Sequence, residues 1–89
     1  SDEMALGVLS AAHDLGLRVP QDVSIIGIDD HDLARLFGLT TVRQDVRAQG
    51  VAAAQALLAQ LGLAPSEMAS DRTFPVEFVK RKSTGPPPA

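Results

Sequence analysis

The stretch "VPQDVSIIGIDDHD", residues 19–32, decides which fold this sequence can adopt. It contains a near-continuous apolar run, residues 23–28, that ends abruptly in three aspartates and a histidine. Continuous rather than alternating apolarity is typical of a strand covered on both faces, as in a parallel sheet. Because ligands of open α/β sheets bind outside the carboxyl ends of the strands, we expect Asp29 to point at a binding crevice.

The segment before this stretch predicts a helix from residue 2 to about residue 15. Ser1 or Asp2 is suited to cap its start, and Gly16 is suited to end it. With a period of 3.6 residues, one face of the helix is apolar: Met4, Val8, Leu9, Ala12 and Leu15. Leu6 falls near the opposite face, beside His13. It is therefore either an isolated exposed leucine or part of a surface that meets a partner.

The segment after this stretch predicts two further strands and a second long helix. Residues 39–44 are β-branched and short, hence a strand, and Asp45 is suited to cap a helix that reaches about residue 61. A last strand is expected over residues 72–81, where Pro75 indicates an edge or a bulge. Residues 83–89, "STGPPPA", are expected to form a disordered tail. Three strands and two long helices are few for an independent parallel α/β domain.

The composition excludes several classes of function. Eight Lys and Arg against eleven Asp and Glu give a net charge of −3, whereas a duplex-binding surface needs clustered cations. The one basic cluster, residues 80–82, is expected to be three solvated side chains at a strand end. The absence of cysteine excludes disulfides, thiolate nucleophiles and zinc–thiolate sites. The start "SDEMALG" lacks an initiator Met, so we expect the chain to be a piece of a longer protein.

The acidic strand end, residues 29–32, does not match the common catalytic or metal-binding patterns. Consecutive residues cannot all converge on one metal ion, and no second acidic cluster follows another strand. Phosphotransfer needs a phosphoacceptor Asp after a later strand, and paired-carboxylate catalysis needs two acids that face each other. The sequence also lacks the "GxSxG", "HExxH" and "GxxxxGK[ST]" motifs. We therefore expect neither an enzyme nor a metal site.

Two readings of the cluster remain open on residue chemistry alone. In one, a carboxylate accepts hydrogen bonds from a small polyhydroxyl or amine-bearing ligand, which gives strong selectivity because a ligand without the donor leaves the acceptor unpaired. In the other, the cluster is a loop in which Asp30 or Asp32 caps a short helical turn over residues 31–37.

Four segments resemble successive C-terminal motifs of the LacI/GalR family of bacterial transcription regulators. They are "DEMALGVLSAAHDLGLRVPQDVSIIGIDD", "LTTVRQD", "GVAAAQALL" and "FVKRKST", in family order and with near-family spacing. The resemblance implies an α/β, parallel-sheet, periplasmic-binding-protein-like (type I) domain, of which residues 1–82 are the C-terminal portion. It implies a small-molecule effector, a sugar or related metabolite, bound in the cleft between the two lobes of the domain. It also implies that the regulator is a homodimer in the cytoplasm. DNA would be contacted only by an N-terminal helix-turn-helix outside this chain, and no cofactor, metal or membrane is implied.

The resemblance also assigns roles to single residues. Asp29 matches the first Asp of the family's "GxDD" motif, which typically bonds the effector, and Asp30 is then read as a structural cap. Ser1 stands where the family usually has an Asn that contacts the cleft. Gln44 and Val46 match the exit of the hinge strand, which lines the cleft in some members.

The first helix resembles the one that the family uses for dimerisation, which predicts Leu6, Ser10 and His13 at the dimer interface. The chain departs from the family pattern in the loop of residues 31–38, which is short and lacks the usual proline before "LTT". Ile28 also replaces a frequent aromatic residue. The alternative function is a solute-binding protein of a membrane transport system, which shares the fold, is exported and binds no DNA.

Overall fold

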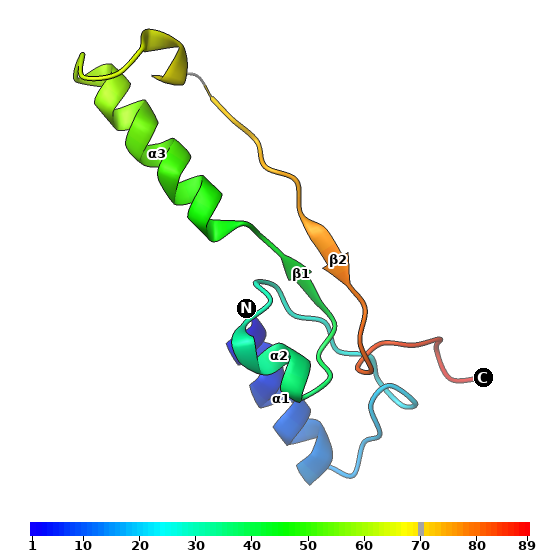
Figure 1. Ribbon diagram of the computed structural model, residues 1–89. Helices are drawn as coiled ribbons and strands as arrows, with labels where there is room; N and C mark the ends of the chain where they lie inside the picture. Colours follow the sequence, from blue (N-terminus) through cyan, green and yellow to red (C-terminus); the bar gives the residue numbers. More distant parts are fainter. Residues whose placement is uncertain (70) are drawn as a thin grey trace. The chain divides into compact units, whose positions relative to one another are not determined.

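The computed structural model describes residues 1–69 and 71–89 of the chain. Its contacts divide the chain into two units, each of which is described by itself. Unit 1 comprises Ser1–Arg43 and Glu77–Ala89, and unit 2 comprises Gln44–Val76. The chain therefore leaves unit 1 once and returns to it once, by way of the strands labelled β1 and β2 (Figure 1).

Unit 1 begins with helix α1, Asp2–Asp14, close to the predicted bounds. The Ser1 hydroxyl oxygen accepts a hydrogen bond from the backbone N–H of Met4 at 3.3 Å, which caps the helix. Gly16, with φ +72°, lets the chain turn away at the other end, a conformation that a side chain disfavours.

The buried face of α1 agrees with the predicted one at Ala12 and, in part, at Leu9, but not at Met4, Val8 and Leu15. Ala5 and Ala12 are buried, whereas Met4 and Leu15 are 72% and 75% exposed. Leu6 and Leu9 are partly buried and pack against the core beside these alanines. The start of the helix lies close to Gly27, where a Cβ would collide with the side chain of Asp2.

The sheet of unit 1 is a short antiparallel pair. Strand β1, Thr41–Arg43, pairs with strand β2, Glu77–Val79, so that Thr41 faces Val79 and Arg43 faces Glu77. Only these three residues of the strand predicted over residues 72–81 form a ladder.

The predicted strand over residues 23–28 is present only as two parallel bridges, Ile26 to Thr40 and Asp29 to Arg43. The expectation that both of its faces are covered is not met, because Ile26 and Ile28 are 53% and 51% exposed. A doubly buried strand needs neighbours on both edges and elements above and below it. Within the described residues the run has bridges only to Thr40 and Arg43. Its other backbone bonds join it to Ser83, whose carbonyl accepts from the Ile25 N–H at 2.9 Å, and to Asp2, whose N–H donates to the Ile28 carbonyl at 2.9 Å.

Helix α2, Asp32–Leu36, completes the small core of unit 1. Ala34 and Leu39 are fully buried at this end of the unit. The buried apolar cluster consists of Ala5, Ala12, Ile25, Ala34 and Leu39. Because three of its members are alanines, this core buries little apolar area. Polar contacts therefore do much to hold the segments of the unit together.

Residues 83–85, which the sequence analysis expects at the start of a disordered tail, are hydrogen-bonded to other segments of unit 1. The Ser83 hydroxyl, which is buried, accepts from the Thr40 N–H at 2.8 Å and donates to the Ile25 carbonyl at 2.6 Å. The Thr84 hydroxyl bonds that of Thr40 at 2.8 Å, and the Gly85 N–H donates to the Ser24 hydroxyl at 3.1 Å. The prolines of this segment led to the prediction of disorder. Hydrogen bonds between hydroxyl groups and residues far away in sequence leave no recognisable pattern in the sequence.

Unit 2 consists of helix α3, Val46–Gln60, and the short 3-10 helix η1, Ser66–Ala69, which lies against it. Asp45 caps α3 by accepting from the Ala48 N–H at 2.9 Å, as predicted. The guanidinium of Arg72 lies over the ring of Phe74, 5.3 Å from its centre.

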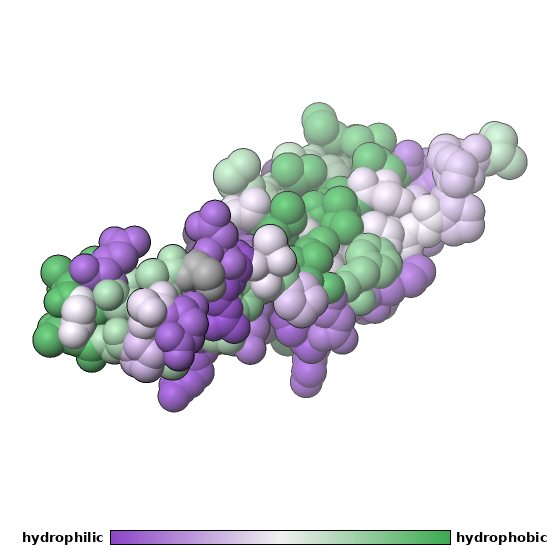
Figure 2. Space-filling view, turned by 90° about the horizontal axis from the view of Figure 1, so that it is seen from above, coloured by the Kyte–Doolittle hydropathy of each residue, from purple (hydrophilic) through white to green (hydrophobic). Residues whose placement is uncertain are grey.

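Large hydrophobic side chains are exposed in both units. Figure 2 shows hydrophobic patches on the surface that it draws. Within residues 1–69 and 71–89, no helix is both long enough and apolar enough to span a membrane.

Candidate functional site

Asp29 and Asp30 form the turn that follows residues 23–28, and β1 holds this turn. Asp29 and Asp30 have φ values of +124° and +54°, which residues with a side chain rarely adopt. The N–H of Asp29 donates to the Val42 carbonyl at 2.9 Å, and the N–H of Asp30 donates to the Thr41 hydroxyl at 3.2 Å. The backbone of the predicted effector contact is thus attached to the strand that leaves unit 1.

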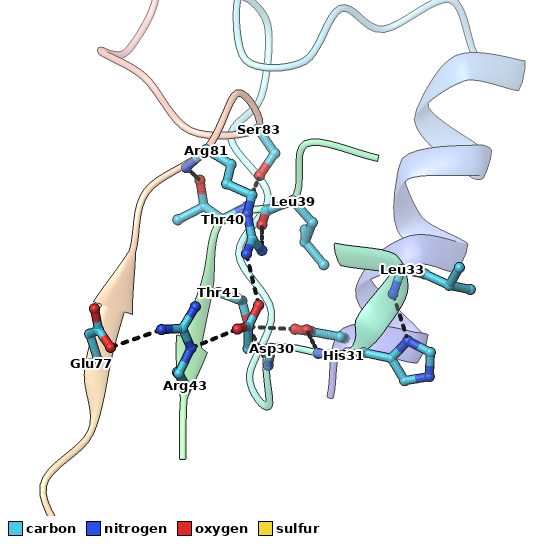
Figure 3. Close-up of polar contacts among 11 residues, drawn as sticks. Asp30, His31, Leu33, Leu39, Thr40, Thr41, Arg43, Glu77, Arg81 and Ser83 are labelled. Atoms are coloured by element: carbon cyan, nitrogen blue, oxygen red, sulfur yellow. Dashed lines mark hydrogen bonds and ion pairs between the residues drawn. The ribbon is translucent and has the colours of Figure 1, made fainter. Parts of the chain in front are cut away.

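Asp30 is not the helix cap that the sequence predicts. Its carboxylate accepts from Arg43 Nε at 2.7 Å and from Arg81 Nη2 at 2.9 Å, so it bridges two guanidinium groups (Figure 3). The cap of α2 is His31, whose Nδ1 accepts from the Leu33 N–H at 3.1 Å. Asp30 lies one residue before the N-cap position, and its two carboxylate oxygens each accept a charge-assisted bond from an arginine.

The electrostatics of this cluster keep its carboxylate ionised. The hydrogen bond from Arg43 lowers the pKa of Asp30, and Arg81 adds to this effect against the opposing cost of partial burial. The pKa of Arg43 is raised, first by Asp30 and then by Glu77, whose carboxylate lies 3.1 Å from Arg43 Nη1. Arg43 therefore joins the acidic turn to the first residue of β2.

The structure also contradicts the prediction that Arg81 is a solvated cation. Its side chain is only 13% exposed, and it donates to the Leu39 carbonyl at 3.0 Å as well as to Asp30. Its neighbours Lys80 and Lys82 are exposed as expected. Alternation along the chain explains the difference, because successive side chains near a strand point to opposite sides.

Asp2 is the buried polar residue of the site that sequence reasoning missed. It is 1% exposed, and its carboxylate accepts from the His31 N–H at 2.7 Å and from the Thr41 hydroxyl at 2.6 Å. Its own N–H donates to the Ile28 carbonyl at 2.9 Å. The only signal in the sequence was an acid at a helix start, which is usually a solvated residue that favours the helix dipole.

The four residues predicted to contact the effector are divided between the two units. Ser1 and Asp29 belong to unit 1, where Ser1 caps α1 directly before Asp2. Gln44 and Val46 belong to unit 2, where the Gln44 amide oxygen accepts from Gln49 Nε2 at 3.4 Å and Val46 is exposed as the first residue of α3.

Two hollows in unit 1 lie near predicted functional residues. A polar hollow of about 250 Å³ is lined by Asp30, His31, Asp32, Arg35 and Arg81. A largely apolar hollow of about 500 Å³ is lined by Leu6, Leu9, Ser10, His13 and Phe37. The second hollow contains all three residues predicted to lie at a dimer interface. In the part of the chain that the structure describes, no group of three or more His, Asp or Glu side chains is arranged to hold a metal ion.

Comparison with known sequences identifies the family of this chain. Residues 1–84 match the periplasmic binding protein-like domain. The chain is 47% identical over 90 residues to the HTH-type transcriptional regulator MalR of Streptomyces coelicolor, covering 99% of this chain and 26% of that protein. It is 38% identical over 86 residues to the lactose operon repressor of Escherichia coli, covering 94% of this chain and 23% of the repressor.

Solved structures agree with the sequence comparison. A LacI-family transcriptional regulatory protein from Corynebacterium glutamicum superposes with a TM-score of 0.67 and 35% identity, over all of this chain and 34% of that one. A probable transcription regulator from Thermus thermophilus gives a TM-score of 0.64 and 40% identity, also over all of this chain and 34% of that one.

The sequence and fold thus define a portion of a periplasmic binding protein-like domain. The chain belongs to the periplasmic binding protein-like domain family, and within it to the LacI/GalR regulators that its motifs resemble. It spans about a quarter of the length of the curated relatives it matches.

Proposed function

We propose that this chain senses a small-molecule effector as part of a ligand-responsive bacterial transcription regulator. The observation that carries the proposal is the attachment of the acidic turn to the points where the chain leaves and re-enters unit 1. Asp30 pairs with Arg43, the last residue before unit 2, and Arg43 pairs with Glu77, the first residue after it. A ligand on Asp29 would therefore act next to both connections between the units.

The effector in this proposal is a sugar or a related polyhydroxyl metabolite. The Asp29 carboxylate accepts hydrogen bonds from its hydroxyl groups, which favours ligands with donors at the matching positions. The Ser1 hydroxyl accepts from Met4 and retains a hydrogen to donate to a ligand oxygen. For Gln44 and Val46 the proposed contact rests on their place in the "TVRQDV" motif.

The proposed mechanism is a shift between two conformations of the regulator. An effector changes the affinity for DNA only by as much as its own affinities for the two conformations differ. A helix-turn-helix domain, of the kind named in the relatives, would make the DNA contact in the cytoplasm. This agrees with the net charge of −3 on the present chain, which does not suit a DNA surface.

The proposed dimer forms through the apolar hollow on α1. Leu6, Ser10 and His13 line it together with Phe37 at the end of α2, so a second copy would cover apolar area from two helices. Leu6→Glu would place a charge in this contact and convert the dimer to a monomer in sedimentation velocity. Val8→Glu, also on α1 but outside the residues lining the hollow, is the matched control.

The experiment that tests the effector proposal uses the natural protein that carries these residues. Monosaccharides and disaccharides are screened by thermal shift, and any stabilising sugar is titrated by calorimetry against wild type, Asp29→Ala and the control Asp32→Ala. We expect Asp29→Ala to lose at least about 100-fold in affinity, since a carboxylate–hydroxyl contact accounts for several kcal/mol of discrimination. Asp32→Ala should bind normally. If Asp29→Ala binds the sugar as tightly as the wild type does, Asp29 is not the effector contact.

A further inference from the structure

The turn at Asp29 is held in a conformation that it would not adopt alone. Both Asp29 and Asp30 have positive φ, which costs free energy for a residue with a side chain. Such a turn persists only when its surroundings determine it. The position of the Asp29 carboxylate therefore depends on the groups that hold the two residues after it.

Three successive backbone N–H groups of the turn are bound by neighbouring elements. Those of Asp29 and Asp30 donate to β1, at Val42 and Thr41, and that of His31 donates to the buried carboxylate of Asp2. These bonds attach the backbone of the turn to β1 and to the start of α1. The side chain of Asp30 supplies the other attachment, to Arg43 and Arg81 (Figure 3).

Resting on the proposed effector role of Asp29, we propose that Asp30 is a positioning residue. By bridging Arg43 and Arg81 it fixes the strained turn in which Asp29 presents its carboxylate, and it ties that turn to both segments that connect the units. The chain of charges runs from Arg81 through Asp30 and Arg43 to Glu77, so a change at either connection reaches the backbone of Asp29.

A second ion pair of the same chemistry shows what a merely local contact looks like. Arg18 and Asp22 share two side-chain hydrogen bonds of 3.1 and 3.0 Å, but they lie four residues apart in an exposed loop. Asp30 is 16% exposed and joins partners 13 and 51 residues away in sequence. Asp22→Asn is therefore a matched control, because it removes one paired carboxylate without loosening a connection between distant segments.

The test measures hydrogen exchange of single amides in the natural protein, without effector, for Asp30→Asn, Arg43→Gln and Asp22→Asn. We expect Asp30→Asn to speed exchange at Asp29 and His31 by about tenfold or more, while amides within α1 change by less than about twofold. Arg43→Gln should give a smaller change in the same direction, and Asp22→Asn none at these amides. A uniform acceleration across α1 and the turn, or no acceleration at Asp29, would overturn the positioning role.

A second variant and the absence of ligand make the exchange experiment decisive for the role of Asp30. If Asp30→Asn does not fold, Arg43→Gln decides, because it leaves the pair between Asp30 and Arg81 in place. The measurement uses no ligand, so a negative result rejects the positioning role and leaves the effector role of Asp29 standing. Conversely, undiminished sugar affinity of Asp29→Ala rejects the proposed function while the exchange data still report on the turn.

Discussion

The two units of this chain are organised by different kinds of contact. In unit 1, polar side chains are buried and bond residues that are far apart in sequence: Asp2, Thr40, Thr41 and Ser83. In unit 2, Ala52 is the one buried side chain among the described residues, and the cap of α3 is a bond between residues three apart. Unit 1 should therefore depend on single polar groups, and unit 2 on the local stability of a helix.

The largest expected effect comes from Asp2 in unit 1. Asp2→Ala leaves the His31 N–H and the Thr41 hydroxyl without their acceptor in a buried place, so we expect the free energy of unfolding to fall by about 3 kcal/mol. Urea denaturation of the natural protein measures this. Glu3→Ala, an exposed acid beside it, should change the free energy by less than about 0.5 kcal/mol. Equal effects of the two variants would contradict the comparison.

Ser83 tests whether the end of the chain belongs to unit 1. Ser83→Ala removes both the acceptor for the Thr40 N–H and the donor to the Ile25 carbonyl, with an expected loss of about 2 kcal/mol in thermal or urea unfolding. Ser66→Ala, an exposed serine in unit 2, is the control and should be close to neutral. If both serines prove neutral, the hydroxyl contacts of Ser83 do not stabilise the unit.

The pH dependence of stability should carry a contribution from Asp30. Its folded-state pKa is lowered, chiefly by Arg43, below the value of about 3.9 expected for the unfolded chain. The contribution is therefore present above about pH 4 and is lost as the pH falls through the folded pKa. We expect Asp30→Asn to be about 1–2 kcal/mol less stable at neutral pH, with the difference shrinking below about pH 4. A difference that persists unchanged at low pH would exclude the charge as its cause.

The smallest expected effect, and one of opposite sign, comes from a glycine in unit 2. Gly50 lies within α3, and apart from its neighbours and the nearby backbone of the helix no atom lies within 4 Å of an added methyl group, so Gly50→Ala should raise stability by about 0.5–1 kcal/mol. Gly27→Ala in unit 1 is the contrasting variant, because its methyl group would meet the Asp2 side chain. Thermal unfolding of both variants sharpens the comparison. Destabilisation by Gly50→Ala would mean that α3 is covered on that side in the natural protein.

Local elements of the fold were predictable because their signals lie in neighbouring residues. The bounds of α1 and α3 follow from the caps at Ser1 and Asp45 and from the glycines after each helix, and the structure confirms them to within about a residue. The strand over residues 23–28 was only partly predictable, because apolarity shows that a segment is suited to burial and not which neighbours are there to cover it.

The polar site was less predictable than the helices. Sequence reasoning brought attention to residues 29–32, but it interpreted Asp30 as a cap, named Asp2 only as an alternative cap of the first helix, and expected Arg81 to be a solvated cation. Each of these side chains is instead paired with a residue at least 13 positions away. Spacing along the chain carries no information about such pairs.

By itself the sequence determined the family, the two long helices and the place of an acidic turn after an apolar run, because these depend on motif order, periodicity and local capping. Only the tertiary structure decided which aspartate is paired, which is buried and which face of α1 is covered. The physical reason is that burial and charge pairing are set by contacts between distant segments. The cost of leaving a buried polar group unpaired then selects one arrangement among several that the local sequence allows.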